Sequence, residues 1–169
     1  MGKCGNDKPD VRFGMEHTDL TSLVIEHGGG GIPMLEPLAQ KFRDGTYRRD
    51  LPAEIVKALV VPADAGLSRT EADKLEQVVK SMGSKGLARA KIGDDGASWT
   101  QSPLAKSVTP AFREAVNAAC GAKAGDLLLF QFGKESVVQT VMANLRVHLG
   151  KKLGKIPETG SGGHWKFLW

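Results

Sequence analysis

The chain reads GDLLLFQFGKESVVQTVMANLRVHLGKKLGK from Gly125 to Lys155, and this stretch decides the fold. The most apolar short run of the sequence, Leu127–Phe132, lies between Asp126 and Gly133, which predicts a buried strand. After Gly133 the apolar residues recur at the three- and four-residue steps of a helix, over residues 134–153. The stripe that this helix turns toward a core consists of Val138, Val141, Met142, Leu145, Leu149 and Leu153.

The other faces of this predicted helix are basic. Gly154 suits the left-handed residue that ends many helices, and late lysines suit the negative end of the helix dipole. The stretch holds five basic and two acidic residues, within a chain whose formal net charge is +4. This local excess permits contact with RNA phosphates, and it is equally compatible with a solvated face or with packing on a neighbouring domain. The candidate RNA contacts are Arg146, Lys151, Lys152 and Lys155.

Length and composition favour one ordinary globular unit. The chain has 169 residues, enough for one core or for one core with an attached arm, and 41% of them are hydrophobic. No apolar run approaches the roughly 18 residues that span a bilayer, and the first ten residues lack the apolar centre of a signal peptide. Cys4 and Cys120 have no metal-type spacing. We therefore expect a reduced, cytoplasmic setting without membrane association.

The N-terminal third is turn-rich. Gly5–Asp19 is polar and predicts an arm that needs a partner surface to become ordered, and Leu20–Ile25 predicts a short helix. Gly28–Gly31 predicts a flexible linker, because it lacks the Lys-Ser/Thr pair of a phosphate-binding loop. Ile32–Leu35 predicts a short strand, which Pro33 would confine to a sheet edge.

The middle of the chain alternates between helical and extended patterns. The clearest helix start is Ser68, whose hydroxyl and the Glu71 carboxylate can form a capping box. Thr109 predicts a second N-cap, before Pro110. Trp99 either packs on its own domain or stacks on a base near the basic face of the preceding strand. Besides the two caps, the patterns predict a helix at Glu36–Phe42 and strands at Ile55–Val61 and Gly86–Ile92.

This alternation favours an α/β sandwich of two layers with helices on one face of a sheet, and a parallel doubly wound sheet is the alternative. No nucleophile elbow or Walker sequence occurs. The histidines are scattered and none has a metal-ligand spacing with Cys or Glu, so we expect no catalytic, cofactor or metal site in this chain. They are His17, His27, His148 and His164.

Blocks of the sequence nevertheless resemble a known family in order. Gly5–Glu16 resembles the segment that leads out of the catalytic domain in bacterial aspartyl-tRNA synthetases, and Trp165–Trp169 resembles the strand that returns to it. The blocks between them resemble the inserted GAD domain of those enzymes. They are LSRTEADKL at Leu67–Leu75, SKGLARAKI at Ser84–Ile92, SPLAK at Ser102–Lys106, GAKAGDLLLF at Gly121–Phe130 and LRVHLGKKLG at Leu145–Gly154.

Three departures accompany the resemblance. Arg89 stands where the family usually has an aromatic residue, and Gly28–Gly31 and Arg43–Pro52 exceed the usual pattern. The class II catalytic motifs are not in this sequence, so no catalytic role is carried onto any position.

The resemblance implies a DCoH-like α+β fold with a mostly antiparallel, four-stranded sheet. It implies an arm at 1–31, a GAD insertion domain at 32–156 and a return segment at 157–169, with neighbouring ends such as Gly5–Arg12 and Phe167–Trp169. The expected role is non-catalytic support within an aspartate–tRNA ligase, whose catalytic domain binds ATP and Mg and which is a homodimer. The expected partners are that domain and the tRNA acceptor arm. The alternatives are a related domain of the tRNA-dependent amidotransferase machinery and a free-standing RNA-binding or docking module.

Overall fold

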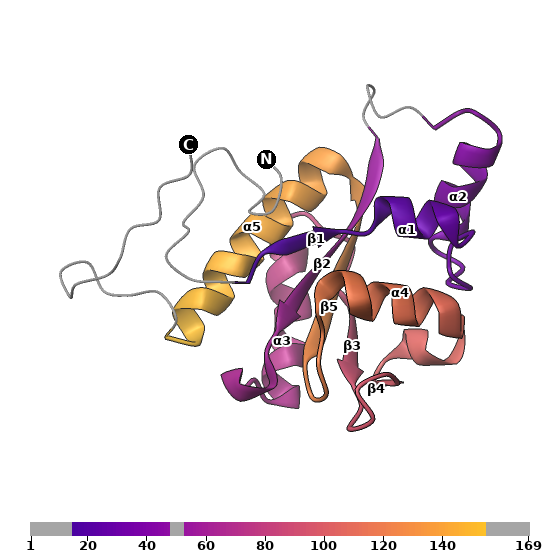
Figure 1. Cartoon of the computed structure of the whole chain (residues 1–169). Helices are drawn as coiled ribbons and strands as arrows, with labels where there is room; N and C mark the ends of the chain where they lie inside the picture. The colour runs from indigo at the N-terminus through magenta and orange to yellow at the C-terminus, as the bar shows by residue number, and fades with distance from the viewer. Residues whose placement is uncertain (1–14, 48–52, 155–169) are drawn as a thin grey trace, which may run out of the picture.

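One open antiparallel sheet lies at the centre of the computed structural model, which describes residues 15–47 and 53–154 (Figure 1). The strand order is β1-β2-β5-β3-β4, and every neighbouring pair is antiparallel. The sheet therefore confirms the α+β class and the antiparallel arrangement, with a fifth strand added to the expected four. The strands are β1 (His17–Asp19), β2 (Glu54–Val61), β3 (Ala88–Ile92), β4 (Trp99–Thr100) and β5 (Leu127–Lys134).

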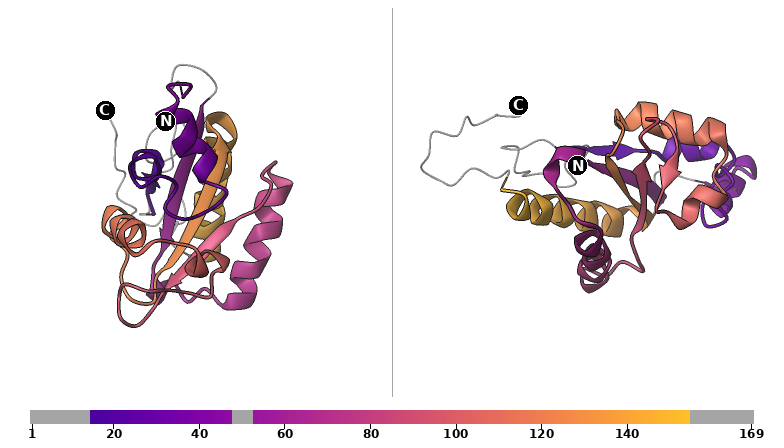
Figure 2. Two further views of the ribbon diagram at one scale, coloured as in Figure 1. Left: turned by 90° about the vertical axis from the view of Figure 1, so that its right-hand side faces the viewer. Right: turned by 90° about the horizontal axis from the view of Figure 1, so that it is seen from below.

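Helices cover both faces of this sheet, where one covered face was expected (Figure 2). The first face packs on α1 (Thr21–Glu26), α2 (Glu36–Arg43) and α4 (Pro110–Cys120), and the second packs on α3 (Arg69–Ser81) and α5 (Glu135–Lys152). Two short 3₁₀ turns, η1 (Ala63–Ala65) and η2 (Pro103–Lys106), complete the order. Alternate residues of β2 serve the two cores: Val56 and Ala58 face the first, and Ile55 and Leu59 face the second.

The stretch from β5 to α5 forms as the periodicity predicts. β5 is paired on both sides, with β2 and β3, which explains its continuous apolar run. Gly154 ends the helix region with φ +62°, the left-handed conformation expected of it. Five residues of the predicted apolar stripe are fully buried and the sixth, Leu153, packs at its end; the buried five are Val138, Val141, Met142, Leu145 and Leu149.

The capping box of α3 is also confirmed. The Glu71 amide donates to Ser68 Oγ at 3.2 Å, and the Ser68 amide donates to Glu71 Oε2 at 2.9 Å. At α4, Pro110 occupies the first turn as expected, but Thr109 makes no side-chain cap. Its own amide instead donates to the Gly30 carbonyl at 2.9 Å, which fixes the start of α4 against the glycine run.

The N-terminal third differs most from its prediction. The polar segment expected to be an arm contributes β1, because His17–Asp19 pairs with Leu59–Lys57 of β2. Ile32–Leu35 is a turn rather than a strand. All four residues of Gly28–Gly31 have positive φ, so the chain coils tightly before α2, and Gly30 lies against the Phe112 ring. The glycine run is therefore a packed turn instead of a flexible linker.

The described chain begins beside the helix in which it ends. The Met15 carbonyl accepts a hydrogen bond of 3.1 Å from Arg146 Nε of α5, and Met15 and Leu153 pack against the same core. The expected pairing of Gly5–Arg12 with Phe167–Trp169 concerns residues outside the described ranges. Across those ranges, no helix combines the length and the hydropathy needed to cross a membrane.

Candidate functional site

The basic end of α5 lies against the first turn of α3. Lys152 Nζ is 3.2 Å from Glu71 Oε1, so one of the candidate cations is held in an ion pair, with 30% of its side chain exposed. Lys151 is exposed, and Lys155 lies outside the described ranges. The two lysines that the structure describes are therefore at the surface, as their place in the sequence predicted.

The Glu71 carboxylate keeps its charge in this position. Its pKa is lowered to about 2, first because the Ser68 amide donates to it, and then because of its contacts with Lys152 and with the Ser68 hydroxyl. At neutral pH this anion anchors the Lys152 ammonium beside the start of α3.

Arg146 does not belong to this surface. The sequence placed it on the basic back of the helix, but only 2% of it is exposed, because β1 and Met15 cover it. It ties α5 to the segment that leads into β1. The periodicity of α5 could not reveal this, because the covering strand has no recognisable apolar pattern.

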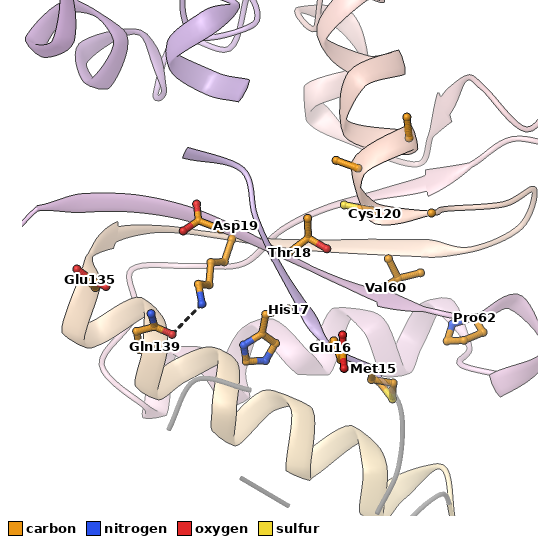
Figure 3. A pocket seen from close by; sticks show the side chains of 14 residues that line it. Met15, Glu16, His17, Thr18, Asp19, Val60, Pro62, Cys120, Glu135 and Gln139 are labelled. Atoms are coloured by element: carbon orange, nitrogen blue, oxygen red, sulfur yellow. Dashed lines mark hydrogen bonds between the residues drawn. The ribbon is translucent and has the colours of Figure 1, made fainter. Parts of the chain in front are cut away.

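A hollow of about 960 Å³ runs along the outer edge of β1 (Figure 3). Its lining combines carboxylates of Glu16, Asp19 and Glu135 with amide, imidazole and amino groups, and the carboxyl end of α4 forms the far wall. No sequence pattern predicts this hollow, since most of its residues come from four separate elements: β1, β2, α4 and α5.

Inside this hollow, two polar side chains are paired deep in the protein. Lys57 Nζ of β2 donates to Gln139 Oε1 of α5 at 2.9 Å, and both residues are buried (Figure 3). A buried ammonium needs such acceptors, because it loses its hydration on folding. The pair therefore fixes the rotation of α5 over the sheet.

His17 lies close to this pair, and its surroundings lower the pKa of its imidazole. Its pKa is lowered from 6.5 to about 4, mainly by burial, then by the positive charge of Lys57 and, less strongly, of Arg146, while the Met142 backbone opposes the shift. Neither ring nitrogen makes a hydrogen bond of good geometry with a described residue, so the interaction with the Met142 backbone is weak. At neutral pH His17 is therefore an uncharged, packed side chain rather than a proton carrier.

Cys120, the last residue of α4, lines the wall of the same hollow that faces β1. Burial raises the pKa of its thiol to about 11, and a hydrogen bond with Thr18 only partly offsets that effect. The thiolate population at neutral pH is then negligible, so the site offers no activated sulfur nucleophile.

A second, smaller hollow of about 250 Å³ opens where α3 begins. Three cationic residues line it: Arg69 from the first turn of α3, and Arg89 and Lys91 from β3. Arg89 also forms an ion pair with Asp73. Arg89 and Lys91 alternate with the buried residues Ala90 and Ile92 along β3, so they share one face of the sheet, and the structure brings Arg69 to them.

Trp99 takes the first of its two predicted roles. It is 5% exposed, its ring packs against Phe130, and its Nε1–H donates to Asn117 Oδ1 at 2.9 Å. A base has no access to this ring. Within residues 15–47 and 53–154, no three His, Cys, Asp or Glu side chains gather in a way that could hold a metal ion.

Comparison with known proteins finds a matching family model and a set of similar ligases. The model of the GAD domain family matches residues 51–142. The aspartate–tRNA(Asp/Asn) ligase of Anaeromyxobacter dehalogenans strain 2CP-C is 64% identical over all 169 residues, which cover 26% of that ligase.

More distant relatives align in the same way. The aspartate–tRNA(Asp/Asn) ligase of Nitratidesulfovibrio vulgaris strain Hildenborough is 37% identical over the whole chain, which covers 24% of it. The aspartate–tRNA ligase of Agathobacter rectalis is 36% identical, again over the whole chain and 25% of its own length. The chain thus spans about a quarter of the length of the curated relatives that it matches.

Proposed function

Since the chain belongs to the GAD domain family, we propose that it acts as an insertion domain of an aspartate–tRNA ligase, where it supports and positions rather than catalyses. The observation that carries this proposal is the alignment itself: all 169 residues match ligases of which they make up about a quarter. The ligase reaction, with its ATP and Mg, then belongs to the remaining three quarters.

The geometry of the described ends supports an insertion. A domain inserted into another must receive and return the chain at neighbouring points. Met15 contacts Arg146 of α5, and α5 is the last element before the described chain ends at Gly154. On this basis residues 15–154, which include β1 and α1, form the inserted body in place of the expected 32–156, and the flanking residues 1–14 and 155–169 connect it to the catalytic domain. The resemblance to aspartyl-tRNA synthetases makes a homodimer the proposed state of the parent enzyme.

The proposal is tested with the isolated chain. We expect no aspartyl-tRNA and no aspartate-dependent exchange of pyrophosphate into ATP when the chain is mixed with ATP, Mg, aspartate and tRNA. A complete ligase related to the chain, assayed in parallel, serves as the positive control. Clear turnover by the chain alone would contradict a supporting role.

A second candidate function is weak binding of the tRNA acceptor arm by the end of α5. Lys151 and Lys152 are at the surface next to one another along the helix, and Lys155 follows them in the sequence. Arg146 is buried and does not contribute to this surface.

Salt dependence tests this binding. Each phosphate that a lysine neutralises steepens the log–log dependence of the binding constant on salt by about 0.7–0.9. The double variant Lys151→Gln and Lys152→Gln should therefore bind a labelled tRNA more weakly and with a shallower slope than the wild type. Lys106→Gln, which removes an exposed lysine of η2, is the matched control. Equal slopes for all three proteins would rule out these contacts.

A further inference from the structure

We propose that the hollow lined by Arg69, Arg89 and Lys91 is a second RNA contact, which holds the phosphate backbone of a strand without reading its bases. The inference rests on the proposed tRNA-binding role of the domain, and it names a surface that lies on α3 and β3 rather than on α5. Four observations support it: the convergence of the cations, their pairing state, the character of the remaining lining and the position of Lys152.

The three cations converge although they are separated in the sequence. β3 alternates, so Arg89 and Lys91 lie on the same side of the sheet, the side that carries α3. Arg69 reaches the same hollow from the first turn of α3, where the capping box fixes the backbone. The site is therefore supported by a strand and a helix, which makes the spacing of its charges well defined.

The charge of the hollow is incompletely compensated. Arg89 is paired with Asp73, whereas Arg69 and Lys91 have no ion pair with any residue that the structure describes. The buried carboxylate of Asp126, next to Gly125 and Leu127 of the lining in the sequence, accepts hydrogen bonds from the amides of Ala63 and Lys123. Two cations are thus available to an anionic ligand, and phosphate is the anion that paired basic side chains bind in nucleic acids.

The rest of the lining favours phosphate contact over base recognition. It consists of aliphatic side chains, the Ser68 and Gln101 side chains and backbone groups, and it contains no aromatic ring on which a base could stack. Trp99, the aromatic residue nearest to β3 in the sequence, is buried in the core on the opposite face of the sheet. Recognition here would therefore be insensitive to base sequence.

The hollow is also close to the candidate lysines of α5. Lys152 is paired with Glu71, two residues after Arg69, so the two groups of cations flank the first turn of α3. One RNA strand or stem that passes this turn could contact both groups.

The double variant Arg69→Gln and Lys91→Gln tests the inference, because neither side chain has an ion-pair partner to lose within the described residues. The probes are a labelled bacterial tRNA(Asp) transcript and a labelled 12-base-pair RNA hairpin, each titrated with the full 169-residue chain at three KCl concentrations. Each lost contact should weaken binding about fivefold to eightfold at 0.1 M salt and reduce the log–log slope by about 0.7–0.9. We expect the effect to be similar for two hairpins of different sequence.

One control variant and two measurements of folding accompany the titrations. Lys106→Gln should leave binding unchanged, and the circular dichroism spectrum and thermal midpoint should show that the double variant is folded. If the double variant binds as tightly as Lys106→Gln while the Lys151/Lys152 variant binds weakly, this inference is overturned and the proposed role of α5 stands. If the wild-type chain binds neither probe, both RNA contacts are refuted and the insertion-domain role remains. A ligase from which this segment has been deleted serves as a protein probe. If the double variant keeps its RNA binding but no longer binds that ligase, the hollow contacts protein instead, which also overturns the inference.

Discussion

His17 should make the folded chain lose stability as the pH falls below neutral. Burial and the charges of Lys57 and Arg146 hold its pKa at about 4 in the folded state, against 6.5 in a free side chain. Between these two values the unfolded chain binds a proton that the folded chain does not bind. The stabilisation is therefore complete above pH 6.5 and is lost progressively as the pH falls toward 4.

The size of the effect follows from the two pKa values. Each pH unit of difference corresponds to about 1.4 kcal/mol, so the interval from 6.5 to about 4 amounts to about 3 kcal/mol when the pH has fallen below both. Between pH 7 and pH 5 most of this loss should already have occurred, about 2 kcal/mol of the free energy of unfolding. This is a large share of the stability of an ordinary domain.

The variant His17→Leu isolates this contribution. It removes the titrating group, and the loss to described partners is small, because neither ring nitrogen makes a hydrogen bond of good geometry and only the Met142 backbone interacts weakly with the ring. Urea unfolding followed by circular dichroism at pH 5, 6 and 7 should show a pH dependence that is smaller than that of the wild type by about 2 kcal/mol. His148→Gln, in α5, controls for the loss of a histidine. If His17→Leu keeps the full pH dependence of the wild type, the suppressed pKa of His17 is refuted.

Three further predictions concern stability at pH 7, measured by urea unfolding. Ser68→Ala should cost about 1 kcal/mol, since it removes the side-chain cap of α3; an unchanged midpoint would contradict the capping box. Asn117→Leu should cost about 1–3 kcal/mol because the buried Trp99 Nε1–H loses its acceptor, and Trp99→Phe in the same background should then cost less than it does alone. Gly30→Ala should cost more than about 1 kcal/mol, because this residue has φ +63° and its new Cβ would lie 2.2 Å from a ring carbon of Phe112; a neutral effect would show that the turn is not packed as described.

Long, strongly periodic elements were predictable from the sequence because their pattern repeats several times. The stripe of α5 and the run of β5 each gave many consistent positions, and the structure confirms both. The capping box at Ser68 needed only local chemistry, since both partners lie within one turn. Thr109 was also predicted to be a cap, but its side chain makes no cap hydrogen bond, and its amide donates to the Gly30 carbonyl, a contact that joins distant parts of the chain.

The candidate sites depended on such long-range contacts and were only partly predictable. β1 has three residues, too few for an alternating pattern, so neither the strand nor the burial of Arg146 beneath its leading segment could be anticipated. The polar hollow along β1 was missed for the same reason. The basic hollow was partly predictable, because alternation along β3 puts Arg89 and Lys91 on one face. The position of Arg69 beside them depends on the packing of α3 on the sheet, which the sequence does not show.

The hydrogen bond between Met15 and Arg146 has a consequence for engineering. Gly154 follows Arg146 by eight residues, a rise of about 12 Å along a helix. A bridge of four or five residues could span that gap, so residues 15–154 should behave as a removable cassette. A ligase whose cassette is replaced by such a bridge should still fold, and its remaining activity would measure directly what the cassette contributes.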